Sequence, residues 1–271
     1  MSMLLIGGDS YVGRSITSDF EKMGKSVSTF SSKKIFSKYS YAELDSNTID
    51  SHDFAVVIGT PGHFRSNFNP SDKAKILKRL SESKINVYVI STIHTVAEKF
   101  VGESKYIRVN RDFEEIALLN DFRVVRIPNF IGVIPESHEN QARLLPWSLL
   151  DNYLKFGFLQ INSNLESEFE WITSLDLCNA ILILENCVFR NVDLQPGYKC
   201  TLEDFVRTFV KFAAEKRNTD VSIQELNHEN VRKVIAGHNP IGALGWKTEL
   251  TGKMFHNYIG EYLHKNWSQN A

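Results

Sequence analysis

The chain has 271 residues, of which 42% are apolar and 23% charged, a composition typical of a globular protein with a sizeable core. Its 31 basic and 32 acidic residues give a net charge of −1, so no electrostatic footprint for nucleic acid or an anionic membrane is present. Apolar runs such as Ala180–Leu184 are far shorter than the roughly 18 residues that a membrane span needs. Three cysteines without CxxC spacing predict neither a disulfide framework nor a metal site, and they favour a reducing, cytoplasmic location.

Short β-rich runs alternate with amphipathic stretches along the first half of the chain. In the first amphipathic stretch, Val12, Ile16 and Phe20 recur at helical spacing. The expected strands are Met3–Gly7, Val27–Phe30, Phe54–Gly59, Ile85–Ser91 and Phe122–Ile127, and the expected helices are Tyr11–Met23, Ser71–Ser83 (with Ser71 as N-cap) and Tyr106–Asn120. Because such alternation is typical of βαβ units, we expect an α/β fold with a doubly wound, parallel, Rossmann-like sheet.

Beyond Pro128 the periodicity weakens. Residues 133–170 mix Pro, Asn, Ser and aromatic residues without a clear period. Helices are expected again at Asp176–Asn186 and Leu202–Glu215, and the end of the chain is an amphipathic tail. We therefore divide the chain into a Rossmann-like domain, 1–132, and a smaller mixed lobe, 133–271, interleaved with the last sheet elements and C-terminal helices.

A glycine-rich turn follows the first expected strand and precedes the first expected helix. Such a turn needs glycine where torsions are unusual and where the chain approaches a phosphate closely, and the helix that follows presents unpaired N–H groups to the phosphate. The turn therefore predicts a site for the pyrophosphate of an NAD-type cofactor, although a plain strand–turn–helix is the alternative. The candidate binding residues are Gly7, Gly8, Asp9, Ser10, Tyr11, Val12 and Gly13.

Ser10 departs from the G-x-x-G-x-x-G form of this turn, which has glycine at that position. Its Cβ either displaces the phosphates outward or its Oγ hydrogen-bonds them, and the sequence leaves both options open.

The end of the second strand selects between NAD and NADP, because an acid there binds the ribose 2′-hydroxyl whereas a cation accommodates a 2′-phosphate. Here Ser31, Ser32 and Lys33 follow Phe30, and no acid is present. This stretch favours NADP over NAD, which stays open; in the alternative interpretation Lys33 belongs to a solvated loop.

With these motifs, the chain resembles the short-chain dehydrogenase/reductase superfamily, in particular its NAD(P)-dependent epimerase/dehydratase (extended or atypical) branch. Leu4–Arg14 is similar to the opening turn of that branch, Val87–Thr92 to the strand that ends in a catalytic Ser or Thr, Phe122–Gly132 to the strand and loop beside the nicotinamide, Phe169–Leu177 to a later segment, and Gly245–Lys247 to a C-terminal LGW motif. The resemblance implies that Asp45 lies near the adenine. It further implies cofactor contacts for Gly59, Thr60, Pro61 and Pro128.

The catalytic chemistry that the resemblance implies depends on a Tyr followed four residues later by a Lys, on the same helix face. The candidate tyrosine is Tyr106, with Thr92 as the polarising hydroxyl, and Glu114 matches a downstream glutamate of the family. The lysine position holds Asn110, which carries no charge, and the neighbouring Arg111 points about 100° away around the helix. Either Tyr106 and Thr92 act with a cation from elsewhere, or the site binds a ligand without efficient redox chemistry.

The resemblance also implies the substrate class. Nucleotide-sugar contacts of the family fall at His138, Asn140, Gln141 and Arg143. We therefore expect an NADP(H)-dependent oxidoreductase or epimerase-like enzyme that acts on a nucleotide sugar or a similar hydroxylated small molecule. The alternative is a catalytically impaired NAD(P)-binding regulatory or ligand-sensing protein. Pairing into a homodimer, as in many relatives, is a further expectation.

Overall fold

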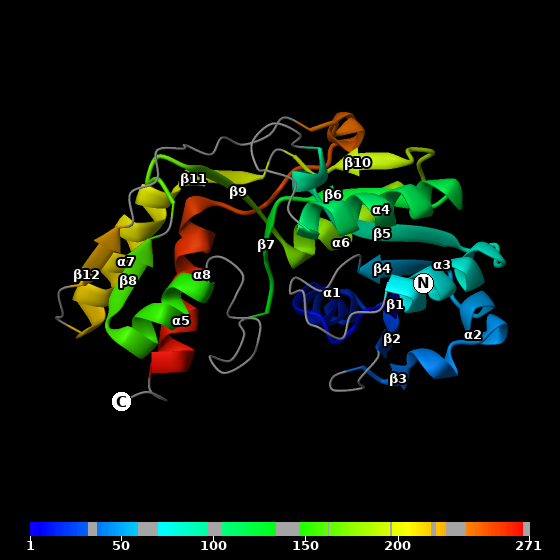
Figure 1. Cartoon of the computed structure of the whole chain (residues 1–271), viewed down its shortest axis with the longest axis horizontal. Coiled ribbons are helices and arrows are strands. Elements are labelled where there is room, and N and C mark those ends of the chain that lie inside the picture. Colours follow the sequence, from blue (N-terminus) through cyan, green and yellow to red (C-terminus); the bar gives the residue numbers. More distant parts are fainter. Residues whose placement is uncertain are drawn as a thin grey trace. The chain divides into compact units, whose positions relative to one another are not determined.

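The fold is described from a computed structural model of the chain (Figure 1). The structure describes residues 1–31, 37–58, 70–96, 105–133, 147–161, 163–195, 197–217, 221–225 and 237–267. The chain divides into two compact units, the first formed by Met1–Val133, Ile172–Pro196 and Ile235–Thr248 and the second by Ile134–Trp171, Gly197–Val234 and Glu249–Ala271. The predicted division into a Rossmann-like domain, 1–132, and a mixed lobe, 133–271, stays a prediction.

The first unit contains a seven-stranded parallel sheet with the order β10-β6-β5-β4-β1-β2-β3. The strands are β1 (Ser2–Ile6), β2 (Ser26–Ser31), β3 (Tyr39–Ser40), β4 (Phe54–Ile58), β5 (Asn86–Thr92), β6 (Arg123–Ile127) and β10 (Asn191–Asp193). The order reverses between β1 and β4, and in such sheets ligands bind at the carboxyl ends of the strands at this switch point. The predicted doubly wound α/β fold is confirmed.

Helices cover both faces of this sheet (Figure 1). They are α1 (Tyr11–Lys22), α2 (Ser46–Asp50), α3 (Pro70–Ser81), α4 (Lys105–Leu119) and α6 (Ser174–Leu184), with 3₁₀ turns η1 (Tyr41–Glu43), η2 (Ile93–Thr95) and η3 (Pro240–Leu244). Phe54 contacts Phe20 of α1, whereas the next residue, Ala55, lies in a core cluster with Leu77 of α3 and Ala117 of α4. Since successive side chains of a strand point to opposite faces, α1 lies across the sheet from α3 and α4.

Local sequence accounts for several element ends. α6 begins with a capping box, in which Thr173 Oγ1 accepts from the N–H of Asp176 at 3.1 Å and Asp176 Oδ2 accepts from the N–H of Thr173 at 2.8 Å. The N-cap predicted at Ser71 is wrong, because α3 already begins at Pro70, where the fixed φ of proline suits the first turn of a helix.

The second unit has its own aromatic core. Its helices and strands are α5 (Trp147–Phe156), β8 (Phe158–Ile161), β9 (Glu168–Thr173, whose last two residues belong to the first unit), β11 (Tyr198–Thr201), α7 (Leu202–Arg217), β12 (Ser222–Glu225) and α8 (Gly252–Trp267). β12 pairs with β8 in parallel, and β11 pairs with β9 antiparallel. Trp147 stacks on Tyr262 with ring centroids 4.8 Å apart, and Tyr153 meets Phe209 edge-on at 4.8 Å. Within the residues that the structure covers, no helix has the length and apolarity to cross a bilayer.

Candidate cofactor and catalytic site

The predicted glycine-rich turn joins β1 to α1 at the carboxyl edge of the sheet. Gly7 has a φ of +94°, which residues with a side chain rarely adopt. A Cβ at Gly13 would lie 2.4 Å from the carbonyl oxygen of Gly7, so only glycine lets the first turn of α1 approach the end of β1 this closely. The backbone N–H groups of Gly7 and Gly8 donate to the carbonyl of Phe30 at 2.8 and 3.1 Å, which ties the turn to β2. The turn thus has the close strand–helix approach that a pyrophosphate cradle requires.

The residues that open α1 differ in what they contact. Ser10 is the N-cap, and its Oγ accepts from the N–H of Gly13 at 2.9 Å. Tyr11 is buried, and its hydroxyl accepts from the N–H of Gly132 at 2.8 Å. Val12 is half-buried. Ser10 therefore has a structural role as a helix cap, and whether it also contacts or displaces a phosphate stays a prediction.

A carboxylate from outside β2 lies beside the end of this strand. Ser31 donates from Oγ to Asp9 Oδ2 at 2.6 Å, and the backbone N–H of Ser37 donates to Asp9 Oδ1 at 2.6 Å. Asp9 belongs to the glycine-rich turn. The turn therefore places an acid beside the end of β2, where the strand itself has no acidic residue. Ser32 and Lys33, on which the NADP prediction depends, lie outside the described residues.

The other cofactor candidates are distributed around the same sheet. Asp45 is the N-cap of α2, where its Oδ1 accepts from the N–H of Thr48 at 2.7 Å, and hydrogen bonds from Thr48 lower the pKa of the Asp45 carboxyl. Pro128 is buried between β6 and the short strand β7 (Asn129–Ile131). The remaining candidates lie outside the described residues, namely Gly59, Thr60 and Pro61.

At the carboxyl end of β5, hydroxyl side chains gather beside α4. Thr92 is 8% exposed, and its Oγ1 caps η2 by accepting from the N–H of His94 at 3.4 Å. Ser91 donates to Glu114 Oε1, and the Thr95 hydroxyl lies 2.8 Å from the same oxygen. These contacts lock the strand end that carries Thr92 against α4.

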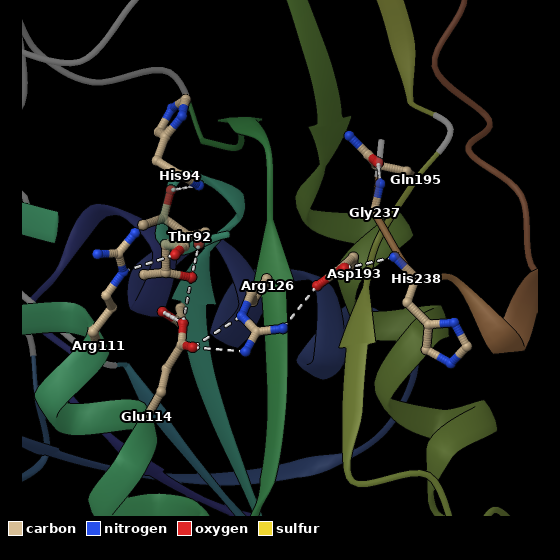
Figure 2. A network of polar contacts seen from close by, with 11 residues as sticks. Thr92, His94, Arg111, Glu114, Arg126, Asp193, Gln195, Gly237 and His238 are labelled. Atoms are coloured by element: carbon tan, nitrogen blue, oxygen red, sulfur yellow. Dashed lines mark hydrogen bonds and ion pairs between the residues drawn. The ribbon is translucent and has the colours of Figure 1, made fainter. Parts of the chain in front are cut away.

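The candidate catalytic helix is α4. Position 106 lies in its first turn, but the side chain of Tyr106 is outside the described part of the structure. Asn110, one turn further on, is 2% exposed. Arg111 donates from Nε to the carbonyl oxygen of Thr95 at 2.9 Å, so its guanidinium reaches the η2 turn beside Thr92 (Figure 2). The positive charge of Arg111 therefore lies next to the end of β5. Arg111 is one residue after Asn110, which stands at the position where the resemblance implies a lysine.

A buried ionic network joins α4 to β6 and β10 (Figure 2). Arg126 donates from Nε and Nη2 to Glu114 Oε2 at 2.9 and 2.8 Å, and from Nη1 to Asp193 Oδ1 at 3.1 Å. Asp193 Oδ2 also accepts from the N–H of His238 at 2.6 Å. The side chains of Arg126, Glu114 and Asp193 are only 13%, 7% and 5% exposed, so the single positive charge of Arg126 is shared between two carboxylates out of water.

The sequence did not indicate Arg126 or Asp193 as site residues, although it did indicate Glu114. Burial disfavours the charged form of Arg126, but the hydrogen bonds and charges of Glu114 and Asp193 outweigh it and raise the pKa of Arg126 above its ordinary value. The sequence does contain a signal for this network, because Arg126 stands between the apolar residues Val125 and Ile127 of a buried strand. An arginine in such a place needs a carboxylate partner.

The last expectations from the sequence concern metal ligands and contacts with a substrate. Among the described residues, no group of three His, Cys, Asp or Glu side chains is arranged to hold a metal ion. The nucleotide-sugar candidates lie outside them, namely His138, Asn140, Gln141 and Arg143.

Comparison with known proteins gives a result at the level of the fold. No family model and no curated protein matches the sequence. Among solved structures, the chain is similar to TunA, an NAD-dependent NDP-hexosamine 5,6-dehydratase of tunicamycin biosynthesis, with a TM-score of 0.76, 13% identity and full coverage of both chains. It is also similar to a UDP-glucose 4-epimerase of Thermotoga maritima, solved with UDP-glucose, with a TM-score of 0.73, 15% identity and coverage of 98% of this chain and 99% of the other.

A third similar structure is a dTDP-glucose 4,6-dehydratase of Bacillus anthracis in complex with NAD, with a TM-score of 0.71, 14% identity and full coverage of both chains. The chain therefore has the same fold as these epimerase and dehydratase structures. The resemblance noted in the sequence is confirmed for the fold.

Proposed function

We propose that this protein binds a nicotinamide dinucleotide at the carboxyl edge of its parallel sheet and acts on a nucleotide sugar as an oxidoreductase or epimerase-like enzyme. The observation that carries the proposal is the turn at Gly7 and Gly13, where a Cβ would fill the space that the close approach leaves. This cradle lies at the switch point of a doubly wound sheet. The substrate class is proposed from solved structures of the same fold, whose names specify UDP-glucose or dTDP-glucose.

The chain's own residues fit such a cofactor. Gly7, Gly8 and Gly13 would hold the pyrophosphate, with the N-terminus of α1 directed at its negative charge. Asp9 and Ser31, whose side chains meet beside the end of β2, would hold the adenosine ribose. A bound nicotinamide would supply a hydride acceptor and donor.

Residues of α4 and β5 would carry out the proton transfer. Tyr106 would exchange a proton between its hydroxyl and the substrate oxygen, and Thr92 Oγ1 would donate a hydrogen bond to the same oxygen. A free tyrosine has a pKa of about 10, so ionisation near neutrality requires a nearby positive charge. Because Asn110 carries no charge, the cation that stabilises the phenolate must come from another residue. Arg111, whose guanidinium reaches the turn after Thr92, is the described residue that best meets this requirement.

A second function is favoured by Asn110. With an uncharged, buried amide at the lysine position, the protein would bind the dinucleotide and sense a ligand without turning it over. The two candidates share the cofactor site and differ only in the proton chemistry.

Cofactor binding and turnover are tested separately. Purified protein is melted with and without NAD(H) and NADP(H), and then incubated with a panel of UDP- and dTDP-sugars. A ligand at about 100 times its Kd stabilises the fold by about 2.7 kcal/mol, which is a clear melting shift. A shift with turnover supports the enzyme, and a shift without turnover on any sugar supports the sensor. No shift with any dinucleotide contradicts both.

The finer expectations from the sequence stay predictions. NADP(H) as the cofactor, a cytoplasmic location and a homodimer are the expected properties. Sedimentation of the purified protein tests the homodimer, which should have twice the mass of the 31.0 kDa chain.

A further inference from the structure

Two side chains of α1 hold the backbone that follows β7. The hydroxyl of Tyr11 accepts from the N–H of Gly132 at 2.8 Å, and Ser15 Oγ accepts from the N–H of Val133 at 3.0 Å. Ser15 Oγ itself donates to the carbonyl oxygen of Tyr11 at 2.8 Å. Because Tyr11 and Ser15 are four residues apart, they lie on the same face of the helix. We call the two contacts with residues 132–133 the α1–β7 latch.

The α1–β7 latch is buried, and its fit depends on glycine. Tyr11 is 4% exposed and Ser15 is fully buried. The ring of Phe130 meets that of Tyr11 edge-on, with centroids 5.7 Å apart. A Cβ on Gly132 would lie 2.0 Å from Ser15 Oγ, so only glycine lets the backbone approach the helix this closely. Both N–H groups lie in the protein interior, where a backbone donor needs an acceptor. Packing and hydrogen bonding therefore specify the same position for this segment.

The latch connects two parts of the carboxyl edge of the sheet. Tyr11 is the first residue of α1 and belongs to the glycine-rich turn. At its other end, the segment 128–133 begins after Ile127, which is the partner of Thr92 in the register of β5 and β6. Val133 is the last residue of the first unit before the chain passes to the second. The segment thus runs from the strand ends beside Thr92 to the helix whose N-terminus a pyrophosphate would contact.

We propose that Tyr11 and Ser15 are positioning residues, which couple dinucleotide binding at the glycine-rich turn to closure of the latch. The inference rests on the proposed function, because it needs a dinucleotide in the cradle. A pyrophosphate would accept from N–H groups in the first turn of α1 and hold that turn in place. The same turn carries Tyr11, and Ser15 follows one turn later, so a bound ligand would keep both acceptors in front of residues 132–133.

The coupling acts in both directions. The closed latch holds the first turn of α1 in the conformation that binds the ligand, so opening it lowers the fraction of chains that are competent to bind. By thermodynamic linkage, the factor by which the ligand favours the closed latch equals the factor by which the closed latch favours the ligand. A change in the latch therefore changes the dissociation constant, whereas a contact that only stabilises the fold leaves the dissociation constant of the folded chain unchanged.

The experiment measures the dissociation constants of NADH and NADPH by calorimetric titration of the native chain, Tyr11→Phe and Ser15→Ala. Each substitution removes only a hydroxyl. Thr17→Val is the matched control, because Thr17 Oγ1 donates to the carbonyl oxygen of Gly13 at 2.8 Å, a contact inside α1. Amide hydrogen exchange of residues 129–133, followed by mass spectrometry with and without the dinucleotide, reports on the latch directly.

The native chain should bind at least one of the two dinucleotides, and binding should slow exchange at the amides of Gly132 and Val133 by about fivefold or more. Tyr11→Phe and Ser15→Ala should bind the same dinucleotide about fivefold or more weakly. Thr17→Val should bind it as the native chain does.

A latch with a purely structural role gives a different pattern. Tyr11→Phe and Ser15→Ala would then melt at a lower temperature and yet, at a temperature where every chain is folded, bind the dinucleotide as tightly as the native chain. That result would overturn the inference and leave the proposed function intact, and so would exchange at residues 132–133 that the ligand does not change. Equal weakening in Thr17→Val would also overturn the inference. The absence of binding of either dinucleotide by the native chain would overturn the proposed function itself.

Discussion

Replacing Arg126 with Met tests whether the buried ionic network holds α4 in place. The substitution removes three charge-assisted hydrogen bonds, two to Glu114 and one to Asp193, and leaves both carboxylates buried. Each such bond contributes about 1.5–3 kcal/mol, but the native state also bears the desolvation of the guanidinium. Breaking a buried pair on one side costs about 3–5 kcal/mol, which is the loss we expect. At roughly 2 °C per kcal/mol, the melting temperature should fall by about 6–10 °C.

Urea unfolding of the native chain and of the Arg126→Met variant gives these free energies. Arg190→Met is the matched control, because Arg190 pairs with Asp121 at 2.8 Å while the two side chains are 64% and 73% exposed. An exposed pair of this kind contributes less than about 1 kcal/mol. A loss below about 1 kcal/mol for Arg126→Met would refute the role assigned to the network.

Three further variants test the turn and the catalytic helix. Ser10→Ala should lower the free energy of unfolding by about 0.5–2 kcal/mol through loss of the α1 cap, while Ser10→Gly should cost only a few tenths, and equal losses in urea unfolding would contradict the capping role. Gly13→Ala should destabilise the protein by about 1–3 kcal/mol and weaken dinucleotide binding, because its Cβ would meet the Gly7 carbonyl, whereas Gly242→Ala meets only a flexible side chain and should bind as the native chain does. Asn110→Lys should raise turnover on the nucleotide-sugar panel if Tyr106 is the proton donor, and no activity in either form would favour the sensor.

The sequence predicts the parallel sheet well because its strands are buried on both faces. Phe54–Ile58 is fully buried, so it appears in the sequence as an uninterrupted apolar run. The short strand Tyr39–Ser40 has too few residues for any periodicity. The strand Glu168–Thr173 is not evident from the sequence, because the charged residue Glu170 interrupts its apolar pattern. In the structure Glu170 is buried and accepts a hydrogen bond from the N–H of Gly197.

The candidate site is predictable only in part, for a related reason. The glycines at 7 and 13 reflect local backbone constraints, which the sequence displays directly. The contact of Asp9 with Ser31 joins residues on neighbouring strand ends, and that of Arg126 with Asp193 joins residues 67 positions apart. Such pairings follow from the packed sheet, so local spacing did not reveal them.

Calorimetric titration of the native chain with NADH and NADPH tests the central claim most directly. We predict saturable binding of one dinucleotide per chain, together with a rise in melting temperature that grows with ligand concentration. No heat of binding and no melting shift with either dinucleotide up to about a millimolar, where even a weak Kd would register, would contradict the claim that the Gly7–Gly13 turn is a cofactor cradle.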